Sequence, residues 1–346
     1  MTKSRDTANI IKQPFTQTLG TSNYRAGVNA GNSITSGGNY NVTVGDEAGT
    51  AITTGDYNTA VGMDSAKAIT TGIKNTAIGS TALDAEVAGN YSTAIGMGAL
   101  TTQSQSGDVD VYNTAVGYLA GGAVTTGTLN TFVGGLAGDA LTVGGSNVSL
   151  GYFSLTADTK GSKSVAVGTA ALGDQNFTSA TDAFNVAIGQ EAGRSVTTGT
   201  LNTLIGGLAG DATTTGTGNT AIGQEALGVN TTGSDNVAIG RDALDANTTA
   251  SNNTAVGKSS LGGNTTGASN VAVGRSALLS NTTASNNTAV GYQAGYTNTT
   301  GVNNLSLGYQ AGYTNATSNY NTAVGTQSLA NNTGSNNVAL GQSALF

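Results

Sequence analysis

Residues 287–301 read Asn-Thr-Ala-Val-Gly-Tyr-Gln-Ala-Gly-Tyr-Thr-Asn-Thr-Thr-Gly, and the first five of them form a signature that recurs along the chain. Its general form is Asn, Thr or Val, Ala, an aliphatic residue and Gly. Eighteen copies begin at Asn41, spaced 17 residues apart except for two steps of 21 and a last step of 16. The Gly of each copy stands at position 45, 62, 79, 96, 117, 134, 151, 168, 189, 206, 223, 240, 257, 274, 291, 308, 325 and 341. A fixed short period of this kind indicates a repeat architecture.

The period and the composition together predict an all-β protein. Seventeen residues are too few for a repeat built from two helices. Gly, Asn and Thr, which dominate the sequence, all disfavour helix. Inside the signature the residues alternate with period 2, which is typical of a short strand. We therefore expect a parallel β-solenoid of about 18 coils, one coil per 17 residues, with a length of about 80–90 Å at the usual strand spacing.

The alternation also raises the question of which residues face the core. The fourth position, as in Val61 and Ile239, is aliphatic in every copy, and we expect it to point inward. The third position, as in Ala60 and Ala238, is nearly always small. We expect it to face outward, where a column of Ala lets sister chains approach closely and favours a homotrimer. The first position is expected to form a stacked ladder of Asn side chains, and a second short strand is expected at the Ala-Leu pairs, as at Ala243.

Composition excludes several classes of protein. The chain has no Cys and no His, so zinc sites, thiol nucleophiles and His-based triads are ruled out. We expect no enzyme activity, no cofactor and no metal. The net charge of −7 disfavours nucleic acid and anionic membranes as partners. No apolar run is long enough to span a bilayer as a helix, and the start of the chain does not read as a secretory signal.

Copies such as Asn185–Gly189 and Asn236–Gly240, which read Asn-Val-Ala-Ile-Gly, resemble the repeat of YadA-like trimeric adhesin heads. The longer copy at 287–301 looks like the version found in bacteriophage fibre and other virion proteins. The resemblance covers residues 41–346. It implies a structural protein of the virion, a tail fibre or spike rod that takes part in host attachment. A glycan-binding adhesin module and a capsid or neck decoration protein are the alternatives.

Residues 1–40 lack the repeat and are expected to form a separate N-terminal domain. It holds basic residues, among them Lys3 and Arg5, and an apolar group of Ile10, Ile11 and Phe15. We interpret it as an arm that docks on another virion protein. A cap on the first coil of the solenoid is the alternative, and the two roles are compatible.

Two further groups of residues are candidate sites. Tyr292 and Tyr309 follow the signature Gly, and Tyr296 and Tyr313 come four residues later, so each pair is 17 residues apart and should stack on adjacent coils. Such a column could bind a receptor glycan or could simply support the solenoid. Acidic pairs lie in the two longer loops, Asp108 with Asp110 and Asp174 with Asp182. Paired carboxylates can hydrolyse glycosides, but loops this short favour plain solvation.

Overall fold

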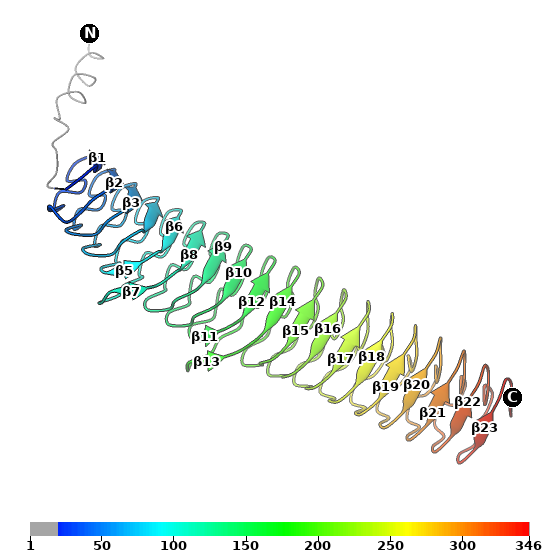
Figure 1. Cartoon of the computed structure of the whole chain (residues 1–346). Coiled ribbons are helices and arrows are strands. Elements are labelled where there is room, and N and C mark those ends of the chain that lie inside the picture. The colour runs from blue at the N-terminus through cyan, green and yellow to red at the C-terminus, as the bar shows by residue number, and fades with distance from the viewer. Residues whose placement is uncertain (1–19, 346) are drawn as a thin grey trace, which may run out of the picture. The chain divides into compact units, whose positions relative to one another are not determined.

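The computed structural model describes residues 20–345, so the predicted docking residues Lys3, Arg5, Ile10, Ile11 and Phe15 lie outside the described part. The chain divides into two compact units, residues 1–145 and 146–346. Within each unit, successive coils stack in parallel, and each coil contributes one strand of three residues (Figure 1). The described residues contain no helix. The prediction of a parallel β-solenoid is confirmed, with about 19 turns, seven in the first unit and twelve in the second.

The first unit contains seven three-residue strands and one pair of two-residue strands. Their bounds are β1 Tyr24–Ala26, β2 Val42–Val44, β3 Thr59–Val61, β4 Thr76–Ile78, β5 Gly89–Asn90, β6 Thr93–Ile95, β7 Val109–Asp110, β8 Thr114–Val116 and β9 Thr131–Val133. The short strands β5 and β7 pair with each other, apart from the main ladder. They mark the first of the two longer loops.

The second unit contains twelve three-residue strands and a second short pair. Their bounds are β10 Val148–Leu150, β11 Gly161–Ser162, β12 Val165–Val167, β13 Thr181–Asp182, β14 Val186–Ile188, β15 Thr203–Ile205, β16 Thr220–Ile222, β17 Val237–Ile239, β18 Thr254–Val256, β19 Val271–Val273, β20 Thr288–Val290, β21 Leu305–Leu307, β22 Thr322–Val324 and β23 Val338–Leu340. The short strands β11 and β13 pair at the second longer loop.

Strand register follows the sequence period directly. Ala238 on β17 lies opposite Ala255 on β18, and every signature pairs in the same way with the next copy inside its unit. One turn precedes the first predicted copy, because β1 pairs in register with β2 and places Arg25 opposite Thr43. The stack of coils therefore starts upstream of the predicted boundary at residue 41. The early turn was missed because its third residue is Arg where the signature has Ala.

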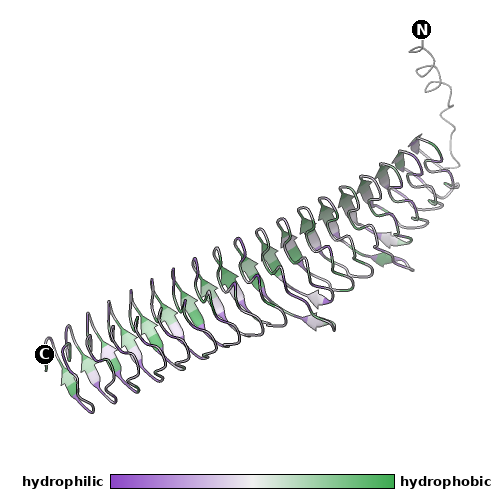
Figure 2. Ribbon diagram, turned by 180° about the vertical axis from the view of Figure 1, so that it is seen from behind, coloured by the Kyte–Doolittle hydropathy of each residue, from purple (hydrophilic) through white to green (hydrophobic). Residues whose placement is uncertain are grey.

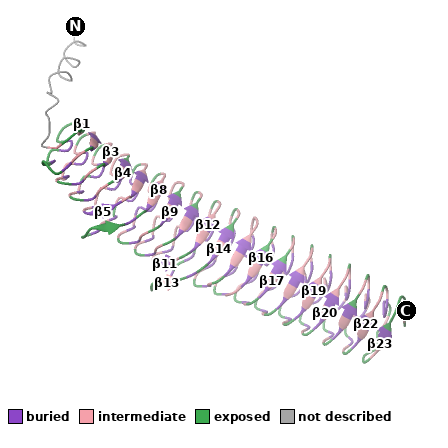
Figure 3. Cartoon of the chain, viewed as in Figure 1, coloured by how far each residue is buried: buried purple, intermediate pink, exposed green. Residues whose placement is uncertain are grey.

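The prediction for the two strand faces is wrong, and the faces are exchanged. Third-position residues are buried, with Ala60 and Ala238 at 0% exposure. Fourth-position residues lie on the outer face of the sheet, where Ile78 is 38% and Ile239 is 36% exposed. From β2 to β23, each three-residue strand therefore shows one buried residue between two more exposed ones, whereas β1 has no buried residue (Figure 3). Figure 2 shows the hydrophobic residues gathered along the strands.

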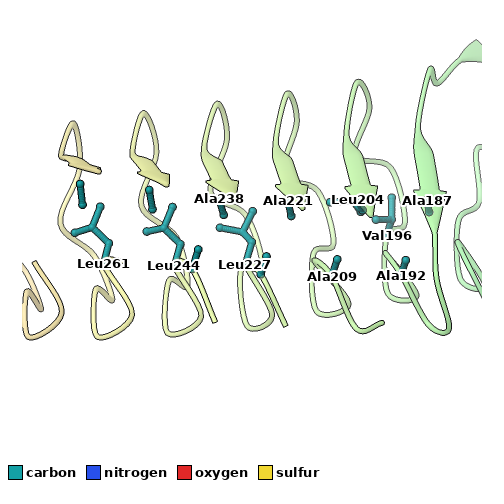
Figure 4. Close-up of a cluster of buried hydrophobic side chains, with 14 of the residues drawn as sticks. Ala187, Ala192, Val196, Leu204, Ala209, Ala221, Leu227, Ala238, Leu244 and Leu261 are labelled. Atoms are coloured by element: carbon teal, nitrogen blue, oxygen red, sulfur yellow. The ribbon is translucent and has the colours of Figure 1, made fainter. Parts of the chain in front are cut away.

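The reason for the exchange is the small volume inside a coil. Counting the signature Asn as the first position, the ninth position of many turns is a buried Leu, such as Leu227 and Leu244, which lies beneath the strand (Figure 4). Only a small residue then fits at the third position, Ala in most turns and Ser149 above Leu155 in one. The exception at Phe132 supports this explanation, because both nearby ninth positions are Gly. A Cβ at Gly121 or Gly138 would lie 2.7 or 2.3 Å from the Phe132 ring.

Asparagine ladders follow the stack, as predicted, although their hydrogen bonds run mainly to the backbone. The side-chain oxygen of Asn41 accepts the backbone N–H of Asn58 at 2.9 Å, and the Asn41 amide donates to the Gly55 carbonyl at 2.8 Å. A second ladder, not predicted, runs at the twelfth position, where Asn247 donates to Asn230 at 2.9 Å. These ladders satisfy polar groups that the thin core would otherwise leave unpaired.

The signature Gly is required for two separate reasons. Gly240 has φ of +129°, a conformation that disfavours residues with a Cβ. A Cβ there would also lie 2.7 Å from the carbonyl carbon of Gly257 in the next turn. The predicted second strand at the Ala-Leu pairs is not found: Ala243 and Leu244 lie in turns, with Leu244 at φ +50°.

Candidate functional site

The predicted tyrosine pairs stack as the period requires. Tyr292 and Tyr309 follow strands β20 and β21, with ring centroids 5.4 Å apart and planes 11° from parallel. Tyr296 and Tyr313 stack in the same way at 5.2 Å and 8°. Tyr292 and Tyr309 are 39% and 49% exposed. Stacking on adjacent coils is therefore confirmed, whereas binding of a glycan at these rings stays a prediction.

The geometry of these pairs limits what they can bind. In each pair one face of each ring is covered by the other ring, and the Arg275 guanidinium lies 6.0 Å from the Tyr292 centroid. Gln residues form a parallel ladder beside the rings, with Gln310 donating to Gln293 at 3.0 Å. The covered ring faces are closed to a sugar ring.

A second aromatic column, in the first unit, was not predicted. It occupies the position just before the signature Asn. Tyr40 stacks on Tyr57 at 4.9 Å, and Tyr91 stacks on Tyr112 at 4.9 Å. Between the two pairs, the Lys74 ammonium lies 5.0 Å from the Tyr91 ring centroid. The 17-residue spacing of Tyr40 and Tyr57 was the available signal, but Lys74 interrupts the aromatic pattern.

The first longer loop is anchored by a buried carboxylate. Glu86 is fully buried and accepts backbone N–H groups from Val87 and Gly89 at 2.9 and 2.7 Å. Gln103 bridges Glu86 to Ser92, both at 2.8 Å. Ser92 is one of the two sites where the signature lacks Asn, so this cluster replaces one step of the ladder. Glu86 therefore serves the structure of the loop.

The second longer loop repeats this arrangement 72 residues further on. Asp158 is fully buried, accepts the backbone N–H of Gly161 at 2.9 Å, and binds the Gln175 amide at 2.6 Å. Gln175 in turn donates to Ser164, the other position without Asn, at 3.1 Å. The equivalence of the two loops indicates that a block of four coils has been duplicated.

Three of the four acidic residues that are glycosidase candidates, Asp108, Asp110 and Asp182, are held by other side chains. The Asn90 amide donates to Asp108 and Asp110 at 2.6 and 3.2 Å, and both carboxylates are exposed. Asp182 forms an ion pair with Lys163 at 2.6 Å. The fourth acid, Asp174, lines a surface pocket together with Glu191.

Partly buried acids lie on the outer surface at the tenth position. The pKa of Asp245 is raised by burial and then by the nearby charges of Asp242 and Glu225. The pKa of Asp211 is raised mainly by burial as well. Among residues 20–345, no group of three or more Asp, Glu, His or Cys side chains could hold a metal ion. The same residues include no helix long and apolar enough to cross a membrane.

Comparison with known proteins gives no family for this chain, because no family model and no curated protein matches it.

Proposed function

We propose that the chain is a structural virion protein, a homotrimeric tail fibre or spike rod. The observation that carries the proposal is the outer face of the main sheet. In the second unit, positions two and four of twelve successive strands present Val, Ile, Leu or Thr, with no charged residue. Contiguous apolar surface of this extent is unusual on a monomer and marks an interaction surface.

The occupant that fits this face best is the same face of a sister chain. Its side chains repeat at the spacing of the coils, about 4.8 Å, and a second copy offers the identical spacing. The resemblance to trimeric adhesin heads supports three copies over two. This interface differs from the Ala interface predicted from the sequence, because Ala238 and its equivalents are buried inside the coil and cannot contact a sister chain.

Mass in solution tests the assembly. The chain weighs 33.8 kDa, so a trimer weighs 3 × 33.8 = 101.4 kDa. We expect the trimer mass for the native protein and a smaller mass when Ile222, Ile239 and Val256 are replaced by Asp. Replacing the exposed Thr249, Thr266 and Thr283 by Asp is the matched control and should leave the mass unchanged. A monomer in the native protein would refute the proposal.

Electron microscopy tests the role in the virion. Antibodies raised against residues 146–345 should label thin external appendages of the particle. Labelling of the capsid surface or neck would favour the decoration protein instead. The proposed N-terminal arm lies outside the described residues, and deleting residues 1–19 should abolish incorporation into particles while leaving the trimer mass intact.

A glycan-binding adhesin module is the second candidate, favoured by the exposed tyrosine pairs. Binding to a glycan array that disappears when Tyr292 and Tyr309 are both replaced by Ala would support it. Unchanged array binding in that variant would exclude these rings as the receptor site.

A further inference from the structure

A slot opens in the second unit where one turn carries two small residues, Ala170 and Gly173, at positions where its neighbours carry larger side chains. Ala170 and Gly173 occupy the seventh and tenth positions of that turn. The turn before has Phe153 and Thr156 at these positions, and the turn after has Glu191 and Arg194. These residues line a surface pocket of about 380 Å³, a volume within the usual range for small-molecule sites.

The width of the slot follows from the coil spacing. Neighbouring turns lie about 4.8 Å apart, so the two walls are separated by about 10 Å. The small residues of the middle turn leave room between the two walls for one further layer of atoms, which would be in van der Waals contact with both walls. A single six-membered ring is about as thick as this layer. The slot therefore accommodates one ring lying parallel to the coils, in the layer that side chains fill in other turns.

One wall of the slot is aromatic. Tyr152 is 54% exposed, and the Phe153 ring meets it edge-on, with centroids 4.2 Å apart and planes at 79°. Both rings line the pocket. Unlike the Tyr292 pair, the two rings do not stack in parallel on each other, so ring face remains for contact with a ligand. An aromatic wall of this kind attracts the C–H face of a sugar.

The opposite wall and the rim are polar. The Arg194 guanidinium lies 3.3 Å from the Glu191 carboxylate, and Asp174 and two threonines complete the lining. The formal charge of these groups sums to −1, which disfavours an anionic ligand. Carboxylates, guanidinium and hydroxyl groups together offer both acceptors and donors to neighbouring hydroxyl groups. A plain aromatic ring would fill the slot but form no hydrogen bonds with these polar groups.

We propose that this slot binds one hexopyranose ring of a neutral or amino sugar. Its C–H face lies against the aromatic wall, where one of the rings of Tyr152 and Phe153 presents its face and the other its edge, and its hydroxyl groups lie on Asp174, Glu191 and Arg194. The inference goes beyond the structural role proposed above, and it stands whether or not the chain forms a fibre. The site is also distinct from the tyrosine pairs of the last turns.

Saturation-transfer NMR on the full chain tests the proposal, with glucose, galactose, N-acetylglucosamine and glucosamine as probes. We expect transfer to the ring protons of at least one of them. Tyr152→Ala should raise the dissociation constant about tenfold, because it removes one aromatic contact with the sugar. Ala170→Gln should abolish binding by filling the slot. The turn can accept Gln, because Gln293 holds the same position in its own turn with φ of +53°.

Two controls separate this site from others. Ser276→Gln makes the same change at the seventh position of another turn and should leave sugar binding unchanged. Replacing Tyr292 and Tyr309 by Ala should also leave it unchanged. The proposal is overturned if none of the four sugars binds, if binding survives Ala170→Gln, or if binding is lost with the Tyr292 pair. Binding of p-cresol with no binding of any sugar would likewise overturn it, in favour of an aromatic ligand.

Discussion

The strongest prediction concerns the exchange of volume between the third and ninth positions of a turn. Leu204 is a rare large residue at the third position and is fully buried. It fills the space left by Gly at the ninth position of its own turn and of the turn before, since a Cβ at Gly210 would lie 2.7 Å from its Cδ2 and a Cβ at Gly193 would lie 2.6 Å from its Cδ1. The standard arrangement, as at Ala238 and Leu244, is the reverse. Leu204→Ala combined with Gly210→Leu should therefore rebuild a standard turn.

Leu204→Ala alone should lower the free energy of unfolding by about 2–5 kcal/mol, because it leaves a cavity. Gly210→Leu alone should lower the free energy of unfolding by about 1–3 kcal/mol, because it overpacks the core. The double variant should recover most of both losses, with a coupling energy of at least about 2 kcal/mol. The positive φ of Gly210 is no obstacle, because Leu227 and Leu244 hold the same conformation at the ninth position.

Local hydrogen exchange is the suitable assay, because stacked coils need not unfold as one cooperative unit. Peptides covering residues 200–215 should exchange faster in each single variant and near the native rate in the double variant. Leu204→Ala with Gly210→Ala is the matched control and should recover less, since it adds only one carbon. If the double variant loses as much as the two single variants together, the two sites do not share one volume and the explanation of the core is wrong.

Three further predictions rest on single positions. Gly240→Ala should lower the thermal midpoint by several degrees, whereas Gly207→Ala, where a Cβ meets no atom within 4 Å, should not change it. Asp245→Asn should raise the thermal midpoint at neutral pH but not near pH 3. The pKa of Asp245 is raised in the folded protein, so its ionised carboxylate destabilises the fold, and the native protein loses stability as pH rises through that pKa. Glu86→Ala leaves buried N–H groups unpaired, so limited proteolysis should cut the first longer loop, which stays intact in the native protein.

The repeat period alone allowed the parallel coils and their register to be predicted. Within each unit, every signature pairs with its neighbour because the period leaves one register in which like residues meet. The stacking of Tyr292 on Tyr309 and the Asn ladder could be predicted for the same reason. These features depend only on spacing along the chain.

Which of the two strand faces points into the core could not be predicted from the spacing. Alternation defines two faces, and the larger aliphatic residue was assigned to the core. The interior of a 17-residue coil is too narrow for that choice once Leu244 and its equivalents enter from the opposite side. The available clue was the pairing of Phe132 with Gly121 and Gly138. Similarly, the slot at Ala170 depends on residues from three turns and shows only when the turns are stacked.

The most direct test of the proposed assembly is the reactivity of a single cysteine introduced on the outer sheet face, since the chain has no cysteine of its own. Ile239→Cys should form disulfide-linked pairs of chains on mild oxidation, because the face is proposed to meet its equivalent in a sister chain. Cysteine at the exposed Thr249, outside the strand, is the control and should remain unlinked. If Ile239→Cys stays a single chain and reacts with soluble maleimide as fast as Thr249→Cys, the face is open to solvent and the proposed assembly is contradicted.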